Sequence, residues 1–350
     1  MRALTVVPGS SGSATVRDVP EPVRGPGDLL VDGLAVGICG TDREIAAGED
    51  GWAPAGKEHL VLGHESLGRV RAAPEGSGFP PGDLVVGVVR RPDHVPCGAC
   101  AHGAFDMCRN GRYTERGIKE LPGYASERWC VETGYAVRLD PGLGEVGVLL
   151  EPISVVAKAW RQVELIGGRS WFEPRTVLVP GAGPIGLLAA LLGVQRGLEV
   201  HVLDRVADGV EPDLVRELGA TYSCDGFDAA IAAGRPDVVI EATGAAALVL
   251  AAMGGTGSYG LTCLTGVSPE GRRVEWDAGG LNRTLVLEND AVLGSVNANA
   301  DHYRAAADAL ARADRDWLAR LLTRRVPLAA ATDALRPDPD GVKTVITLQD

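Results

Sequence analysis

The chain has 350 residues, more than one typical hydrophobic core contains, so we predict two domains. A formal net charge of −12 argues against binding to nucleic acid or to an anionic membrane. The longest apolar run, residues 185–194, is too short to cross a bilayer, and the composition is typical of a soluble globular protein. Residues 1–7 lack the cleavage pattern of a signal peptide, so we expect a cytoplasmic protein.

The first 150 residues are mostly short strands and loops. Strand-like runs cover residues 1–7, 29–36, 67–72 and 84–89, and turn-rich segments separate them. Gly37-Ile-Cys-Gly-Thr-Asp42 follows the second run, where Thr41 or Asp42 is placed to cap a short helix. Helical periodicity is scarce, which indicates a β-rich, partly barrelled domain.

Strands and helices alternate in the middle of the chain. The expected strands cover residues 175–180, 198–203, 238–240 and 258–264, and the expected helices cover residues 149–163, 181–196, 213–218 and 245–253. This alternation predicts a doubly wound parallel sheet, the Rossmann fold. The tail, with strands at 292–296 and 342–348 and a helix at 302–322, is more like the beginning. We therefore predict a β-rich domain from residues 1–155 and 295–350, with a Rossmann domain inserted at 156–294.

A glycine-rich loop follows the first strand of the predicted Rossmann domain. Gly181 permits a tight turn, Gly183 lets a pyrophosphate approach the backbone, and Gly186 lets the next helix pack on the strand. The helix N-terminus then faces the phosphates. A glycine-rich turn without a ligand is the weaker alternative, because this loop lies between a buried strand and a helix. The predicted cofactor contacts in the loop are Gly181, Gly183, Pro184, Ile185 and Gly186.

Asp204 stands at the end of the next expected strand. A carboxylate there accepts hydrogen bonds from the ribose hydroxyls and repels a 2′-phosphate, which favours NAD over NADP. Arg205 follows directly and could hold a 2′-phosphate, so use of NADP stays open.

Two groups of residues have the chemistry of zinc ligands. The first contains thiol, imidazole and carboxylate groups at the ends of ordered elements: Cys39, His64, Glu65 and Glu151. Each residue also has an alternative without a metal. Cys39 could be a buried structural thiol, and His64 a hydrogen-bonded histidine beside Glu65 at the surface. Glu151 could simply start a helix, with proline as the next residue. The second has the spacing of a structural zinc site, His94-x2-Cys97-x2-Cys100-x7-Cys108, in which His102 is a rival fourth ligand.

The chain resembles the medium-chain, zinc-dependent alcohol dehydrogenases, and more closely their glucose 1-dehydrogenase branch. The motifs that carry this resemblance extend over nearly the whole chain: Gly37–Asp42, Leu62–Glu65, Arg90–Pro92, Asp106–Cys108, Thr114–Ile118, Leu150–Pro152, Gly294–Asn299 with His302, and Gly341–Val345. The resemblance implies a GroES-like catalytic domain built from both ends of the chain. It also implies a homodimer or homotetramer.

The resemblance further implies a role for each candidate residue. Cys39, His64 and Glu151 would hold a catalytic zinc, with Glu65 a near or exchanging ligand. The residues implied to face the sugar are Thr41, Glu115, Glu151 and Asn299, while Asn297 would lie near the nicotinamide ribose. The expected reaction is reversible oxidation of a sugar or cyclitol hydroxyl, which for an aldose gives a lactone. Glu65, Thr41 or a water would relay the proton.

Two departures from the family pattern bear on function. His94 stands where the family usually has the first of four cysteines, so zinc in this lobe is expected to bind weakly or not at all. Ala157 stands where many sugar-oxidising relatives have an acid, which would relax or change substrate choice. A dedicated biosynthetic dehydrogenase of an aminocyclitol, a sugar nucleotide or another polyhydroxylated intermediate is therefore the alternative enzyme. A zinc-free quinone reductase or a non-catalytic cofactor-binding protein would lack the Cys39, His64 and Glu151 set.

Overall fold

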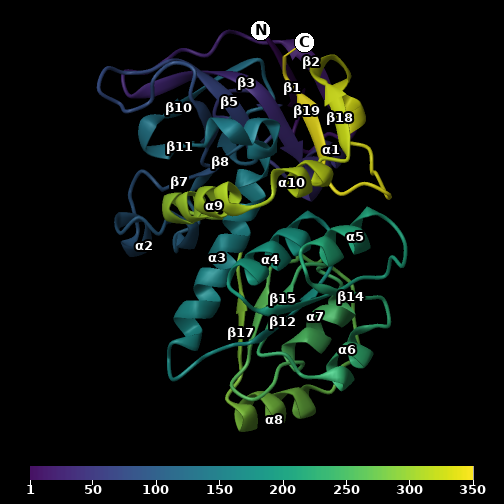
Figure 1. Cartoon of the computed structure of the whole chain (residues 1–350). Helices are drawn as coiled ribbons and strands as arrows, with labels where there is room; N and C mark the ends of the chain where they lie inside the picture. Colours follow the sequence, from purple (N-terminus) through teal and green to yellow (C-terminus); the bar gives the residue numbers. More distant parts are fainter. Residues whose placement is uncertain (350) are drawn as a thin grey trace. The chain divides into compact units, whose positions relative to one another are not determined.

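The computed structural model describes residues 1–349 and divides the chain into two compact units (Figure 1). The first, here the β-rich unit, contains Met1–Ser154 together with the chain from Ala298 onward. The second, here the Rossmann unit, contains Val155–Asn297. The purple beginning and yellow end of the chain therefore share one unit, and the green middle forms the other.

A seven-stranded sheet is the centre of the β-rich unit. Its order is β11-β6-β5-β3-β19-β18, and β10 also pairs with β3. The strands are β3 Asp28–Ile38, β5 Glu65–Ala72, β6 Leu84–Gly87, β10 Arg128–Glu132, β11 Ala136–Arg138, β18 Arg324–Pro327 and β19 Thr344–Thr347. The long β3 pairs with β5 along one edge, and with β10 and then β19 along the other. This pairing brings the last strand of the chain beside the segment that leads into Cys39.

Two small sheets and several short helices complete the β-rich unit. One sheet has the order β2-β1-β4 and the other β7-β8-β9. Their strands are β1 Arg2–Val6, β2 Thr15–Asp18, β4 Leu60–Val61, β7 Arg90–Arg91, β8 Thr114–Arg116 and β9 Glu120–Leu121. The α-helices are α1 Gly40–Ala47, α2 Gly98–Ala101, α9 Ala300–Arg312, α10 Arg315–Leu321 and α11 Ala331–Ala334. Short 3-10 segments cover Phe105–Met107, Thr133–Tyr135, Pro141–Leu149 and Leu328–Ala330.

The Rossmann unit is built on a six-stranded sheet whose paired strands all run parallel, in the order β14-β13-β12-β15-β16-β17. The strands are β12 Thr176–Pro180, β13 Glu199–Leu203, β14 Thr221–Ser223, β15 Val238–Glu241, β16 Leu261–Leu264 and β17 Ala291–Gly294. The helices between them are α4 Pro184–Gln195, α5 Val210–Glu217, α6 Phe227–Ala233, α7 Ala246–Met253 and α8 Ala278–Glu288. Helix α3, Leu150–Gly167, runs from one unit into the other. The predicted fold class is confirmed.

Several element boundaries differ from those expected, each for a local reason. The helix expected at 302–322 is two helices, because the Asp314 side chain accepts hydrogen bonds from the N–H groups of Asp316 and Trp317 and starts a new helix there. The helix after the glycine loop begins at Pro184, because Gly181 has a φ of 105° and cannot be helical. Among the described residues, no helix has the length and apolar character needed to span a bilayer.

Candidate active site

Three predicted zinc ligands come together in the β-rich unit. One ligand atom each from Cys39, His64 and Glu65 lies within 4.8 Å of the other two. Cys39 is the N-cap of α1, directly after β3, and Glu65 is the first residue of β5. Gly63, with a φ of 87°, makes the turn that leads into His64. The Cys39 Sγ lies 3.1 Å from the His64 Nε2.

Asp42 orients the cysteine and the histidine of this group. Its Oδ2 accepts a hydrogen bond from the Cys39 N–H at 3.0 Å, and its Oδ1 lies 3.3 Å from the His64 Nδ1. Burial opposes protonation of His64, but the negative charges of Cys39 and Asp42 outweigh it and raise the pKa of the imidazole well above its usual value. A carboxylate behind a metal-binding histidine fixes the ring orientation, so Asp42 belongs to the site. The sequence indicated only its capping role.

Lys343 is the cation beside Glu65. Its ammonium is ion-paired with the Glu65 carboxylate, and both side chains are buried. Burial opposes the charge on Lys343, yet the carboxylate of Glu65 and the thiol of Cys39 raise its pKa above the usual value. Gly37 on β3 leaves the room for this pair, since a Cβ at that position would lie 2.0 Å from the Glu65 Oε2.

Glu151, at the start of α3, lies outside the group whose ligand atoms are within 4.8 Å of one another. It is 8% exposed, and burial raises the pKa of its carboxyl to about 7. The positive charge of His64 opposes that rise, and the negative charge of Glu65 adds to it. Glu151 therefore shares the electrostatic environment of the site, and whether it is a metal ligand stays a prediction.

The chemistry of this group fits a zinc ion. Thiolate, imidazole and carboxylate are the ligands that catalytic zinc sites use, with one position left for water or substrate. The buried carboxyl groups of Asp42, Glu65 and Glu151, together with the Cys39 side chain, interact electrostatically with the cations of Lys343 and His64. A divalent cation would balance this excess of negative charge.

Two residues predicted to face a sugar belong to one polar network in the β-rich unit. The Arg90 side chain donates to the Glu115 Oε1 at 3.0 Å and to the backbone oxygen of Asp106, also at 3.0 Å. The Asp106 Oδ1 in turn accepts a hydrogen bond from the Asn299 Nδ2 at 3.0 Å. Arg90 and Asp106 therefore connect Glu115 with Asn299, although no role is predicted for either of them from the sequence. Thr41 lies half-buried in the first turn of α1.

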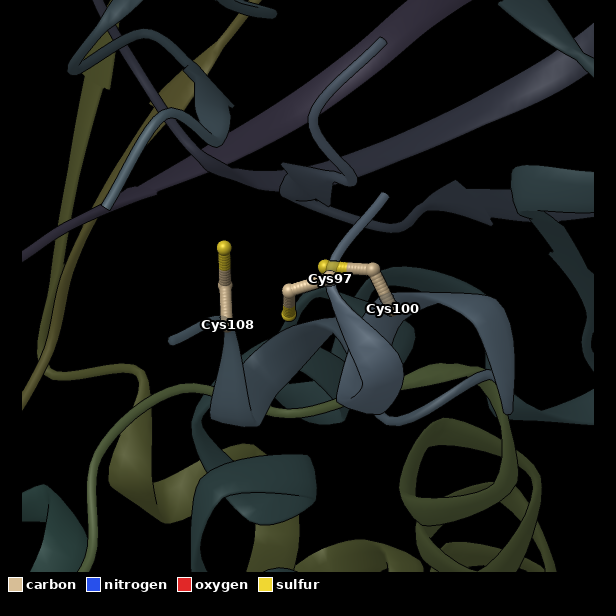
Figure 2. A group of neighbouring side chains, drawn as sticks. All are labelled: Cys97, Cys100 and Cys108. Carbon is tan, nitrogen blue, oxygen red and sulfur yellow. The ribbon is translucent and has the colours of Figure 1, made fainter. Parts of the chain in front are cut away.

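Of the second predicted group of zinc ligands, the structure brings together the three cysteines but not the histidine. Ligand atoms of Cys97, Cys100 and Cys108 lie within 4.8 Å of one another (Figure 2). His94 is exposed and lies outside this group, as does His102. Backbone N–H groups, first that of Arg109, lower the pKa of the Cys97 thiol to about 6.

The glycine loop of the Rossmann unit has the shape that a dinucleotide needs. Gly181 has a φ of 105°, and a Cβ at Gly186 would lie 1.7 Å from the Gly181 carbonyl oxygen. A Cβ at Gly183, in contrast, would have nothing within 4 Å, so the backbone is open to a ligand there. The Asp204 carboxylate accepts hydrogen bonds from the N–H groups of Ala182 and Arg205, both at 2.6 Å. Asp204 is thus held at the glycine loop, next to the exposed Arg205.

The segment that carries Asn297 is anchored within the Rossmann unit. The Lys158 ammonium, on α3, donates to the Val296 carbonyl oxygen at 2.8 Å, and Lys158 is buried. Asn297, three residues after the end of β17, has a φ of 62°, in the left-handed region. Ala157, which lies one position before Lys158 on α3, is 7% exposed.

Comparison with known proteins identifies the family. The model named "Alcohol dehydrogenase GroES-like domain" matches residues 25–141, and the model named "Glucose dehydrogenase C-terminus" matches residues 144–348. The chain belongs to the medium-chain, zinc-dependent alcohol dehydrogenase family. The predicted family and enzyme class are confirmed.

Relatives within this family are glucose 1-dehydrogenases. The chain is 39% identical to "Glucose 1-dehydrogenase" of Methanocella arvoryzae over 99% of each chain. It is also 39% identical to "Glucose 1-dehydrogenase" of Thermoproteus tenax over 100% of each. A solved structure of Haloferax mediterranei glucose dehydrogenase in complex with NADP, Zn and gluconolactone matches 100% of each chain, with 33% identity and a TM-score of 0.91.

Proposed function

We propose that this protein is a zinc-dependent dehydrogenase that oxidises C1 of glucose or a similar aldose to the lactone. The Cys39, His64 and Glu65 group carries the proposal, because its donor atoms lie close together and have the chemistry that catalytic zinc sites use, in a chain that matches a glucose 1-dehydrogenase over 99% of its length. In the overall reaction, aldose and NAD(P)+ give lactone, NAD(P)H and a proton. The reaction is reversible.

The proposed ligands of the zinc are Cys39, His64 and Glu151, with Glu65 as a near or exchanging ligand. A zinc ion held there supplies Lewis acidity toward the hydroxyl oxygen of the substrate. Asp42 fixes the imidazole, and Lys343 holds the Glu65 carboxylate in place. The hydroxyl proton leaves through Glu65, Thr41 or a water.

Recognition of the sugar is assigned to Thr41, Glu115, Glu151 and Asn299. Polyol binding needs several directed donors and acceptors, and a side chain with its rotamer fixed loses less entropy on binding. The bonds of Arg90 to Glu115 and of Asp106 to Asn299 fix two of these side chains.

For the cofactor we propose a preference for NAD over NADP, with the dinucleotide at Gly181, Gly183, Pro184, Ile185 and Gly186 and with Asn297 near the nicotinamide ribose. The Asp204 carboxylate, held at the loop, supports this preference because it repels a 2′-phosphate. The exposed Arg205 is the group that would accept NADP. Measuring kcat/KM with both cofactors tests the assignment, and a large preference for NADP would contradict it.

The experiment that tests the activity is a screen of aldoses, polyols and aminocyclitols with both cofactors, following reduced cofactor and identifying the product. Glucose or a similar aldose should give lactone, and Cys39→Ser should abolish turnover while cofactor binding remains. Absence of turnover with every sugar and polyol would contradict the proposal. Turnover of a modified sugar or aminocyclitol but not of plain aldoses would favour the biosynthetic alternative, which the alanine at position 157 supports.

We also propose a homodimer or homotetramer. The edge strand β17 of the parallel sheet is only partly buried within this chain, and a second copy is one way to cover such an edge. Light scattering on the purified protein measures the molar mass, and a monomer at all concentrations would contradict this assignment.

A further inference from the structure

The three cysteines of the second group form a compact cluster of thiols. Cys97 is the N-cap of the single-turn helix α2, Cys100 lies within that helix, and Cys108 follows the 3-10 segment Phe105–Met107 (Figure 2). Their sulfur atoms lie within 4.8 Å of one another. Cys100 is 8% exposed, while Cys97 and Cys108 are half-buried and therefore reachable from solvent.

Neither nearby histidine completes this cluster. His94 is exposed and lies outside it. The His102 Nδ1 lies 2.7 Å from the backbone oxygen of Gly98, within the same helical turn, and His102 is also exposed. A fourth protein ligand from either residue would require a change in conformation.

The polar side chains around the thiols are engaged with one another. The Asn110 Oδ1 accepts a hydrogen bond from the Cys108 Sγ at 2.8 Å, and its Nδ2 donates to the Asp93 Oδ2 at 2.6 Å. Asp93 also accepts from the Val95 N–H at 3.1 Å and forms an ion pair with Arg112 at 2.9 Å. The Asp93 carboxylate is thus held by three other groups.

We infer that Cys97, Cys100 and Cys108 form an open three-thiolate metal centre, in which an exchangeable external ligand takes the fourth position. Closed structural zinc sites use four protein ligands, whereas this cluster supplies three. Three thiolates are a soft donor set and select soft ions, so the centre favours cadmium over zinc and releases zinc readily to chelators. This inference does not rest on the proposed dehydrogenase activity.

The test follows cadmium binding to the full-length, metal-free chain through the ultraviolet thiolate-to-cadmium charge-transfer band. A Cys39→Ser background removes the thiolate of the other candidate site. In that background, Cys108→Ser should lower cadmium affinity by more than roughly 10- to 100-fold. That range is the typical loss when a residue that only hydrogen-bonds to a metal ligand is removed. His94→Ala and His102→Ala are the matched controls, and each should leave the affinity unchanged. A small added thiol should bind at the fourth position and raise the intensity of the charge-transfer band from the value for three thiolates to the value for four.

Three results would overturn the inference. If His94→Ala or His102→Ala weakens cadmium binding as much as Cys108→Ser, the site has four protein ligands. If added thiol leaves the band unchanged, the fourth position is closed. If the Cys39→Ser chain binds cadmium no more tightly than a chain that also lacks Cys97, Cys100 and Cys108, the cluster is not a metal centre. Circular dichroism of each variant shows whether it is folded.

Discussion

The buried ammonium of Lys343 is ion-paired with the carboxylate of Glu65, which lies 278 positions earlier in the chain. Glu65 begins β5, and Lys343 directly precedes β19. Both strands pair with β3, so the sheet holds the two residues together. The end of the chain thereby supplies a cation to a site whose proposed zinc ligands all lie in its first half.

We predict that Lys343→Met destabilises the protein by about 3–5 kcal/mol, because it leaves the Glu65 carboxylate buried without its cation. Urea unfolding of the metal-free chain measures this. Adding Glu65→Gln to Lys343→Met should restore most of the loss. Lys57→Met, at an exposed lysine, is the control and should have little effect. A loss in the double variant as large as in Lys343→Met would show that the ion pair is not its cause.

Gly37→Ala should disturb the same pair from the neighbouring strand. The new Cβ would lie 2.0 Å from the Glu65 Oε2 and 2.9 Å from the Lys343 Cε. We expect a loss of about 1–3 kcal/mol from overpacking, together with weaker zinc binding in a chelator competition. Gly40→Ala is the matched control, since a Cβ there has nothing within 4 Å. Equal zinc affinity in both variants would mean that Glu65 has no part in binding the metal.

Two glycines of the cofactor loop should respond differently to alanine. Gly183→Ala has nothing within 4 Å of the new Cβ, so the protein should fold normally but bind NADH more weakly, because the methyl group occupies the approach of the pyrophosphate. Gly186→Ala places a Cβ 1.7 Å from the Gly181 oxygen and should lower the free energy of unfolding itself. Fluorescence titration with NADH and denaturant unfolding separate the two effects. Unchanged NADH affinity in Gly183→Ala would place the pyrophosphate elsewhere.

The parallel sheet could be predicted from the sequence because each of its main strands is a short apolar run that neighbours a segment with the periodicity of a helix. Residues 175–180 were expected as a strand and β12 is Thr176–Pro180. The short elements β14 and α6 were not expected, since three and seven residues give too little periodicity to recognise. Helix α8 was missed for a different reason: none of its residues is buried, so it has no clear apolar face.

The site was predicted less completely, because its remaining residues are defined by tertiary contacts. The motif Gly341–Val345 was recognised, but nothing local shows that Lys343 meets Glu65. The position of Asp42 in the sequence predicts a helix cap. Its contact with the His64 imidazole depends on the tertiary fold, which brings the two residues together. His94 has the right spacing for a ligand, but spacing does not fix the direction of an exposed side chain.

Acid should weaken the protein partly through Glu132. Burial opposes its ionisation, but the hydrogen bonds and charge of Arg91 outweigh burial and lower the pKa of Glu132 from 4.5 to about 2. A lowered pKa in the folded state stabilises the fold above pH 4.5, and this contribution is lost as the pH falls from 4.5 toward 2. Unfolding free energies measured across this range should therefore fall less steeply for Glu132→Gln than for the wild type. Glu49→Gln, at an exposed acid, should follow the wild type; equal slopes for all three proteins would exclude Glu132 as a source of acid sensitivity.

Asp106 should act on the sugar through Asn299. Its Oδ1 accepts the Asn299 Nδ2 at 3.0 Å, and Asp106 is 5% exposed. Asp106→Ala removes that acceptor, so the Asn299 Nδ2 loses this partner and the amide is held only through its Oδ1 at the helix cap, and we expect KM for the aldose to rise by up to about tenfold. KM for NAD should stay the same, and kcat should change little.

Asp106→Asn separates positioning from a loss of structure, because its amide oxygen can still accept from Asn299 and should restore most of the aldose affinity. Steady-state kinetics in both substrates, with unfolding curves for each variant, provide the readout. A rise in KM for aldose and NAD together would indicate a general loss of structure. An unchanged aldose KM in a folded Asp106→Ala would show that the orientation of Asn299 does not matter to the sugar. Since Asn299 also caps α9, Asn299→Ala should cost about 1 kcal/mol of stability as well as aldose affinity.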